Sequence, residues 1–161
     1  MCLLTDTNKC KVAERDIVVY KYVAKRVRIQ DSRSKKKLVR QDEEDYWKHY
    51  LHEFVWVSPY RITSKTIYNI GSTIVDGSFQ RVTEKKDYAS DFFIVEKGLH
   101  AYANETEAVI RANTFAGADG GSGVLKCVIP KDTRYWVSEN GLEYCAETLK
   151  VNYLTYEAFA D

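Results

Sequence analysis

The sequence predicts an α+β fold: a mostly antiparallel, twisted sheet with two helices packed against it. Short β-branched and aromatic runs outnumber helical stripes and do not alternate regularly with them, which argues against a doubly wound α/β fold. The chain has 161 residues, a length typical of one domain with a sizeable core. Hydrophobic residues make up 45% of the chain, as in an ordinary globular protein.

The chain is expected to begin with an arm and then a strand. Residues 1–15 are polar and lack a hydrophobic period, which predicts an irregular arm, and residues 16–161 are expected to form a single α+β domain. Residues 17–23 are β-branched and aromatic and predict a strand. Over residues 26–30 apolar and polar side chains alternate, so the strand is predicted to continue at a sheet edge with one solvent-exposed face.

A charged segment and an aromatic stripe follow. Residues 31–45 run from basic to acidic and predict a solvated loop whose acidic end suits a helix N-terminus. The next large apolar residues have helical spacing; they are Tyr46, Trp47, Tyr50, Leu51 and Phe54. This stripe predicts a core-facing helix that ends before Pro59. His49 and His52 lie on another face of that helix and could share a ligand, but no third metal ligand accompanies them, so no metal site is expected.

The middle of the chain predicts short strands separated by turns. Residues 65–71 form a short β-branched and aromatic run closed by a glycine. Residues 72–82 predict a hairpin with Asp76–Gly77 at its turn. Residues 92–95 predict a further strand.

Residues 98–102, Gly-Leu-His-Ala-Tyr, are expected to form a turn that connects this strand to a helix. The helix is predicted over residues 104–113, because Asn104 is a good N-cap and Glu107 follows it at the spacing of a capping box. In such a connection the imidazole of His100 can point into a cleft. It can equally be a turn histidine that is hydrogen-bonded to the backbone.

The last third predicts a central strand and an antiparallel continuation. Residues 116–123 contain four glycines, but they precede a strand and lack the Gly-Lys-Ser/Thr ending of a phosphate-binding loop, so they predict a connection. Residues 124–130 are apolar on both faces and predict a central strand. A short strand over 133–137, a turn at 138–141 and one long strand or two over 143–159 complete the prediction.

Charge and cysteine usage exclude several classes of protein. The net charge is +1, with 24 basic and 23 acidic residues, so a dedicated non-specific DNA binder is not expected. No apolar run approaches the roughly 20 residues of a membrane-spanning helix, and the start of the chain turns polar too early for a signal peptide. The four cysteines form no CxxC pair, so no zinc site is expected. Without a secretory context, reduced thiols and a cytoplasmic location are expected. No cofactor is expected.

Three motifs in the C-terminal half carry a resemblance. They are the Gly-Leu-His-Ala-Tyr turn at 98–102, the run "VLKCVIPKDTRYWV" at 124–137 and the run "EYCAETLKV" at 143–151. Together they resemble small uncharacterised proteins of phages and gut bacteria, which share a Gly-aromatic-His turn and an Ile-Pro-Lys-Gly-Thr-x-Tyr strand, over roughly residues 92–151. Asp132 stands where that pattern has glycine. The resemblance implies an intracellular protein, in the host cytoplasm if it is phage-encoded, without an established activity.

The features above favour a small binding protein, such as a phage anti-defence protein that sequesters a nucleotide signal or inhibits a host protein. Aromatic faces stack on bases, and arginine pairs with phosphate. The candidate ligand-binding residues lie at predicted strand ends and turns; they are Tyr60, Arg61, His100, Tyr102, Arg134, Tyr135 and Trp136. Each of them also has a structural interpretation as boundary packing. A homo-oligomer is compatible with this function, and no membrane partner is expected.

Three other functions stay open from the sequence. In an enzyme similar to ADP-ribosyltransferases that acts on NAD, His100 and Glu147 would be the candidate groups. In a nucleophilic hydrolase, Cys127 or Cys145 would need His100 beside it, although apolar strand surroundings raise the pKa of a thiol and make it inert. In a structural or assembly protein of a phage, the charged block at residues 31–45 would mediate contacts.

Overall fold

The computed structural model describes residues 3–30, 36–41, 43–59, 66–83 and 92–159, and it has the predicted α+β fold. All strand pairs within the described residues are antiparallel. The helices are α1 (Glu44–Trp47) and α2 (Glu105–Asp119). The strands are β1 (Leu3–Thr5), β2 (Lys11–Val12), β3 (Ile17–Gln30), β4 (Lys36–Arg40), β5 (His52–Val57), β6 (Thr73–Val75), β7 (Phe93–Val95), β8 (Leu99–Tyr102), β9 (Ser122–Ile129), β10 (Arg134–Val137), β11 (Glu143–Ala146) and β12 (Thr148–Ala158).

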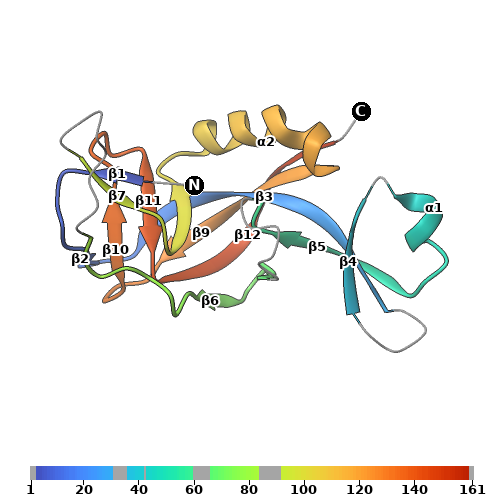
Figure 1. Ribbon diagram of the computed structural model, residues 1–161, viewed down its shortest axis with the longest axis horizontal. Helices are drawn as coiled ribbons and strands as arrows, with labels where there is room; N and C mark the ends of the chain where they lie inside the picture. The colour runs from blue at the N-terminus through green and yellow to red at the C-terminus, as the bar shows by residue number, and fades with distance from the viewer. Residues whose placement is uncertain (1–2, 31–35, 42, 60–65, 84–91, 160–161) are drawn as a thin grey trace.

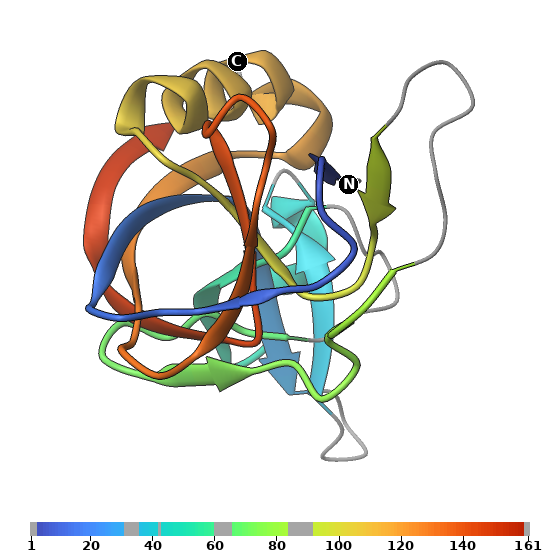
Figure 2. The same ribbon diagram turned by 90° about the vertical axis from the view of Figure 1, so that its left-hand side faces the viewer.

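The main sheet has the strand order β2-β10-β11-β8-β3-β9-β12-β6, and β1 and β7 form a separate two-stranded sheet. The main sheet curls around its inner face, as the view along the molecule shows (Figure 2). The inner face holds the largest core cluster, which includes Val19, Leu125, Cys127 and Leu149. The sheet therefore wraps its own core, and α2 lies on its outer face (Figure 1).

The long strand β3 connects two parts of the molecule. Its first half pairs with β8 and β9 in the curled body. Its second half pairs with β4 on one side and β5 on the other, and with α1 these strands form a distal extension at one end of the molecule (Figure 1). A small cluster of Val27, Ile29, Val39 and Trp47 holds this distal extension together. The predicted continuation of the strand to residue 30 is confirmed, but the predicted edge position is wrong, because β4 and β5 flank this half of β3.

Helix α2 begins as the sequence predicts and ends later. The side chain of Asn104 accepts a hydrogen bond of 3.0 Å from the backbone N–H of Glu107, which confirms the N-cap. Alanines 108, 112 and 116 are spaced four residues apart and bring the helix close to the sheet. The helix extends to Asp119 and stops at Gly120, which has a left-handed backbone. The guanidinium of Arg40 donates to the carbonyls of Gly117 and Ala118, where a positive charge complements the helix dipole.

The helix predicted from the aromatic stripe is wrong. Only Glu44–Trp47 is helical, and residues 52–57 form β5 instead. Aromatic residues suit strands as well as helices, and the β-branched Val55 and Val57 alternate with Phe54 and Trp56. In β5 the two valines fill a core cluster with Ala24, which a helix over the same residues would not do. Burial of the valine side of the strand therefore outweighs the apparent helical spacing.

Several other predictions made from local sequence signals also differ from the structure. The expected charged loop contains β4, which pairs with the preceding strand β3. The expected irregular arm contains β1 and β2, because these segments hydrogen-bond to the distant strands β7 and β10. The predicted hairpin at 72–82 is not formed: β6 pairs with β12, although the turn after it is held by Asp76, which accepts from Ser78. The predicted turn at 98–102 is mostly strand β8. Within the described part of the chain, no helix is long and apolar enough to cross a membrane.

Candidate functional site

A broad hollow lies where the connection from β2 to β3 passes the ends of β10 and β11. Its volume is about 820 Å³, within the range of small-molecule sites. The residues that line it come from these four strands and the connection; they are Lys11, Val12, Glu14, Arg15, Asp16, Ile17, Val18, Tyr135 and Tyr144. Tyr135 is therefore the one sequence-predicted residue among those that line this hollow.

Two tyrosine rings form the aromatic part of the hollow. The ring centroids of Tyr135 and Tyr144 are 5.8 Å apart and their planes are tilted by 36°. Both rings are half-buried and pack against the inner core of the sheet, which fixes their positions. Burial, and then the proximity of Tyr144 and Glu14, raise the pKa of Tyr135 above its usual value. Its hydroxyl therefore stays protonated at neutral pH and can donate a hydrogen bond to a ligand.

Charged side chains of both signs surround the tyrosine pair. Lys11 and Arg15 supply two cations, and Glu14 and Asp16 supply two carboxylates. The segment that carries them is anchored to the turn before β10: the N–H of Ala13 donates to a carbonyl of that turn, and a carboxyl oxygen of Asp16 accepts from the backbone of the turn at 2.9 Å. The hollow therefore combines aromatic surface with hydrogen-bonding groups on an anchored segment.

Arg134 and Trp136 lie on the other face of β10 and do not reach this hollow. Arg134 is 3.5 Å from the carboxylate of Glu147, with both side chains partly exposed. The thiol of Cys10 lies nearby; burial raises its pKa, and the charge of Arg134 opposes that shift. Trp136 is only 1% exposed and donates its indole N–H to the carbonyl of Gln80 at 2.7 Å. In the described structure Trp136 is a core residue, and Arg134 pairs with an acid.

His100 lies in the core as well. The strand register places His100, Cys145 and Trp136 in one row across β8, β11 and β10. This row places His100 two strands from β10, and all three side chains are buried. Tyr102 is buried beneath α2, in the cluster that contains Ala108 and Ala112. Neither side chain is exposed to a ligand in this conformation.

The fold does place a thiol beside His100, with Cys145 Sγ 3.7 Å from His100 Nε2. However, Nε2 is also 3.0 Å from the carbonyl of Glu96, which can only accept, so Nε2 carries the proton. The thiol of Cys145 lies 3.5 Å from the carbonyl of Lys97 and donates to it. Because the nearby nitrogen is protonated and the sulfur is fully buried, this pair does not form an activated nucleophile. Burial raises the pKa of the other candidate, Cys127, to about 12.

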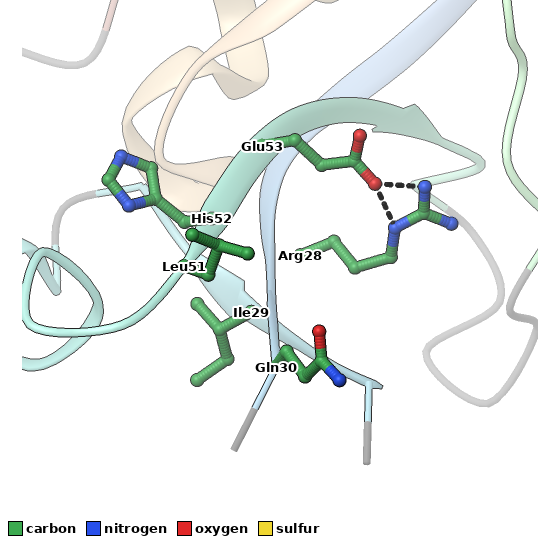
Figure 3. A pocket seen from close by; sticks show the side chains of 6 residues that line it. All are labelled: Arg28, Ile29, Gln30, Leu51, His52 and Glu53. Atoms are coloured by element: carbon green, nitrogen blue, oxygen red, sulfur yellow. Dashed lines mark hydrogen bonds and ion pairs between the residues drawn. The ribbon is translucent and has the colours of Figure 1, made fainter. Parts of the chain in front are cut away.

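A second, smaller hollow of about 240 Å³ lies in the distal extension (Figure 3). The guanidinium of Arg28 pairs there with the carboxylate of Glu53 across β3 and β5. The imidazole of His52 points away from this pair (Figure 3). It packs on the ring of Trp47, with centroids 4.6 Å apart. Among the described residues, no group of three or more His, Cys, Asp or Glu side chains could hold a metal ion. The small volume and the internal ion pair indicate a structural role for these residues.

Sequence reasoning missed most of the residues around the first hollow. Tyr144 lies in a predicted strand, where alternation gives no sign of a site. Lys11 and Arg15 lie in the segment predicted to be an irregular arm, and only the pairing of β2 with β10 brings them to the tyrosines. The predicted site residues Tyr60 and Arg61 lie outside the described residues.

The hollow beside Tyr135 and Tyr144 is thus the strongest candidate for a ligand site. It combines volume, two fixed aromatic rings and charged groups on a segment anchored by backbone hydrogen bonds. No protein-family model, curated protein or solved structure shows significant similarity to the chain.

Proposed function

We propose that this protein is a small binding protein and that it holds a nucleotide-like ligand in the hollow beside Tyr135 and Tyr144. The observation that carries the proposal is the pair of tyrosine rings, fixed by the core and bordered by Lys11 and Arg15. A base can stack on a tyrosine face, and a phosphate can pair with the two cations. Glu14 accepts hydrogen bonds and suits the exocyclic amine or the ribose hydroxyls of such a ligand.

The arrangement favours binding over catalysis. The groups that an NAD-dependent transferase would use are engaged elsewhere: His100 is buried and Glu147 pairs with Arg134. The two carboxylates of the hollow, Glu14 and Asp16, lie on one connecting segment. The carboxylate of Asp16 already accepts a hydrogen bond from a backbone N–H. A role as a phage-encoded sequestering protein, or as an inhibitor of a host protein, extends this proposal and is supported by the sequence resemblance alone.

Recovery of a bound molecule tests the proposal directly. The purified protein is mixed with a nucleotide pool that includes NAD and cyclic dinucleotides, separated from unbound molecules and heat-denatured, and the released molecules are identified by mass spectrometry. We expect an intact nucleotide. Titration with that nucleotide should then give a dissociation constant that rises about tenfold in Tyr144→Leu, since stacking on one aromatic ring contributes about 1–3 kcal/mol.

Tyr46→Leu is the matched control, because Tyr46 is also a partly exposed tyrosine but lies on α1 in the distal extension. It should bind the nucleotide as the wild type does. A ligand at 100 times its dissociation constant stabilises a protein by about 2.7 kcal/mol. The proposal fails if no nucleotide is recovered and none changes the melting temperature. It also fails if NAD is consumed by the wild type but not by Glu147→Gln, which would indicate an enzyme.

A further inference from the structure

A second aromatic surface lies on the outer face of the main sheet, away from the hollow. Tyr20 on β3, Lys126 on β9 and Tyr153 on β12 are register partners and form one row across three adjacent strands. The ammonium of Lys126 lies 5.4 Å from the centroid of the Tyr153 ring and donates to its hydroxyl at 3.2 Å. Half of the Tyr153 side chain is exposed. The row therefore places a cation between the exposed ring of Tyr153 and the half-buried ring of Tyr20.

A β-bulge turns Tyr153 to this face. Val151 pairs with Cys127 and faces the buried core, and the next pair along the ladder is Tyr153 with Lys126. In a regular strand Val151 and Tyr153 would lie on the same face, because side chains alternate with a period of two. The extra residue, Asn152, shifts the register and re-aims the tyrosine outward. The exposed position of Tyr153 is thus built into the strand.

Helix α2 packs on only part of this outer face. It covers the half that contains Tyr22, Val124 and Tyr156, and the half-buried ring of Tyr20 packs against the same cluster. On the half that carries the row, Val18 is 45% exposed and Lys150 is exposed. The register places Val18 and Lys150 beside Val128, in the neighbouring row of the same face.

The charge of this outer face is positive. Lys126 and Lys150 supply two cations, and the hydrogen bond to Tyr153 raises the pKa of Lys126, which keeps it protonated. Strands β3, β9 and β12 contain one carboxylate, Glu157, and it lies on the opposite face in an ion pair of 2.7 Å with Lys25. The outer face of these three strands therefore carries two lysines and no carboxylate, and it complements a polyanion.

We infer that the outer face of β3, β9 and β12 binds single-stranded nucleic acid, with a base stacked on Tyr153 and phosphates at Lys126 and Lys150. Tyr153 offers the stacking surface because half of its side chain is exposed, whereas Tyr20 packs against the cluster beneath α2. Stacking of this kind needs unpaired bases, whereas a duplex hides them. Two lysines are few for duplex binding, which depends on many phosphate contacts. This surface is separate from the proposed nucleotide hollow and does not depend on it.

The experiment measures binding of fluorescein-labelled single-stranded oligonucleotides, dT12 and rU12, by fluorescence anisotropy at low salt. We expect binding that weakens at least about fivefold in Tyr153→Ala, the lower end of the effect of removing one stacking ring. Lys126→Gln should weaken binding and reduce the dependence on salt, whose log–log slope should be about −1.4 in the wild type for two phosphate contacts to a single strand.

The control is Tyr46→Ala, because Lys37 lies over the Tyr46 ring at 5.2 Å in the same kind of lysine–tyrosine pair, but in the distal extension. It should bind as the wild type does, and the thermal melts of all variants should match the wild type. The inference is overturned if the wild type does not bind either oligonucleotide, if a 12-base-pair duplex binds equally well, or if Tyr46→Ala weakens binding as much as Tyr153→Ala. It is also overturned if Tyr144→Leu abolishes binding while Tyr153→Ala does not, which would place the strand in the hollow.

Discussion

At the scale of single residues, burial decides which candidate side chains are available to a ligand. Tyr135 and Trp136 are neighbours in sequence, but strand alternation turns one toward the hollow and the other into the core. His100 has a buried neighbour, Cys145, and a backbone carbonyl as its hydrogen-bond partner. These contacts explain why an isolated histidine in a glycine-containing segment belongs to the core.

Gly98 is the residue on which this buried arrangement depends most. Its φ is +138°, and a Cβ atom at this position would lie 2.4 Å from Cys145 Sγ and 3.0 Å from the ring of Phe79. Gly98→Ala should therefore lower the free energy of unfolding by about 2–4 kcal/mol, from backbone strain and overpacking. Urea denaturation followed by tryptophan fluorescence measures this change.

The matched control for Gly98→Ala is Gly117→Ala in α2, where no atom lies within 4 Å of the added Cβ. It should raise the free energy of unfolding by up to about 1 kcal/mol, because alanine is the better helix former. Equal stability of Gly98→Ala and the wild type would contradict the close packing of Gly98 against Cys145.

The thiol of Cys127 should make stability depend on pH at alkaline values. Burial raises its pKa from 9.0 to about 12 in the folded chain, and Lys21 partly opposes the shift. Below pH 9 the thiol is protonated in both states. Between pH 9 and 12 it ionises in the unfolded chain but not in the folded one, so the folded state loses about 1.4 kcal/mol per pH unit as the pH rises.

Cys127→Val keeps an apolar side chain of similar size at this position and removes the titration. Denaturation at pH 8.0 and pH 10.5 should show that the wild type loses about 2 kcal/mol more than the variant over this interval. A parallel loss in both proteins would mean that other groups account for the alkaline effect.

At the scale of elements, strand pairing overrides the local signals. Strand β5 replaces a predicted helix because Val55 and Val57 fill a core cluster with Ala24, while the rings of Phe54 and Trp47 contact each other on the other face. Strand β4 forms from a charged segment because β3 supplies its hydrogen-bond partners. By contrast, the start of α2 is local, since Asn104 caps it through a contact three residues away. This feature was predictable from the sequence for that reason.

The distal extension should unfold more readily than the body, since it is held by the small cluster around Trp47. Trp47→Ala should destabilise the distal extension by about 3–5 kcal/mol, the usual cost of removing a core tryptophan. Hydrogen exchange measured by mass spectrometry should show faster exchange in β4 and β5, with little change in β9. Tyr46→Ala, which removes a more exposed ring from the same helix, should leave the exchange in β4 and β5 nearly unchanged.

The local-unfolding prediction for Trp47→Ala has a clear contrary result. If β9 exchanges faster by the same factor as β4, the distal extension and the body unfold together. In that case the loss of Trp47 destabilises β3 along its whole length, and the distal extension and the body form one cooperative unit.

At the scale of the whole molecule, β3 organises the fold. Its 14 residues pair with β8 and β9 in the body and with β4 and β5 in the distal extension (Figure 1). The curled sheet leaves two different surfaces for ligands: a hollow beside Tyr135 and Tyr144, and the outer row of Tyr20, Lys126 and Tyr153. Each surface takes residues from strands that are distant in sequence, so neither forms a short motif.

The sequence by itself determined the α+β class, the long strand β3, the central strand β9 and the capped start of α2. These features follow from local periodicity and from contacts between near neighbours in the chain, which composition and spacing encode directly. Only the tertiary structure decided which aromatic residues face a ligand. Burial of His100, Tyr102 and Trp136, the pairing of β2 with β10 and the bulge before Tyr153 all depend on strand register. Register is set by the packing of the whole sheet, because a shift of one residue moves a side chain to the other face.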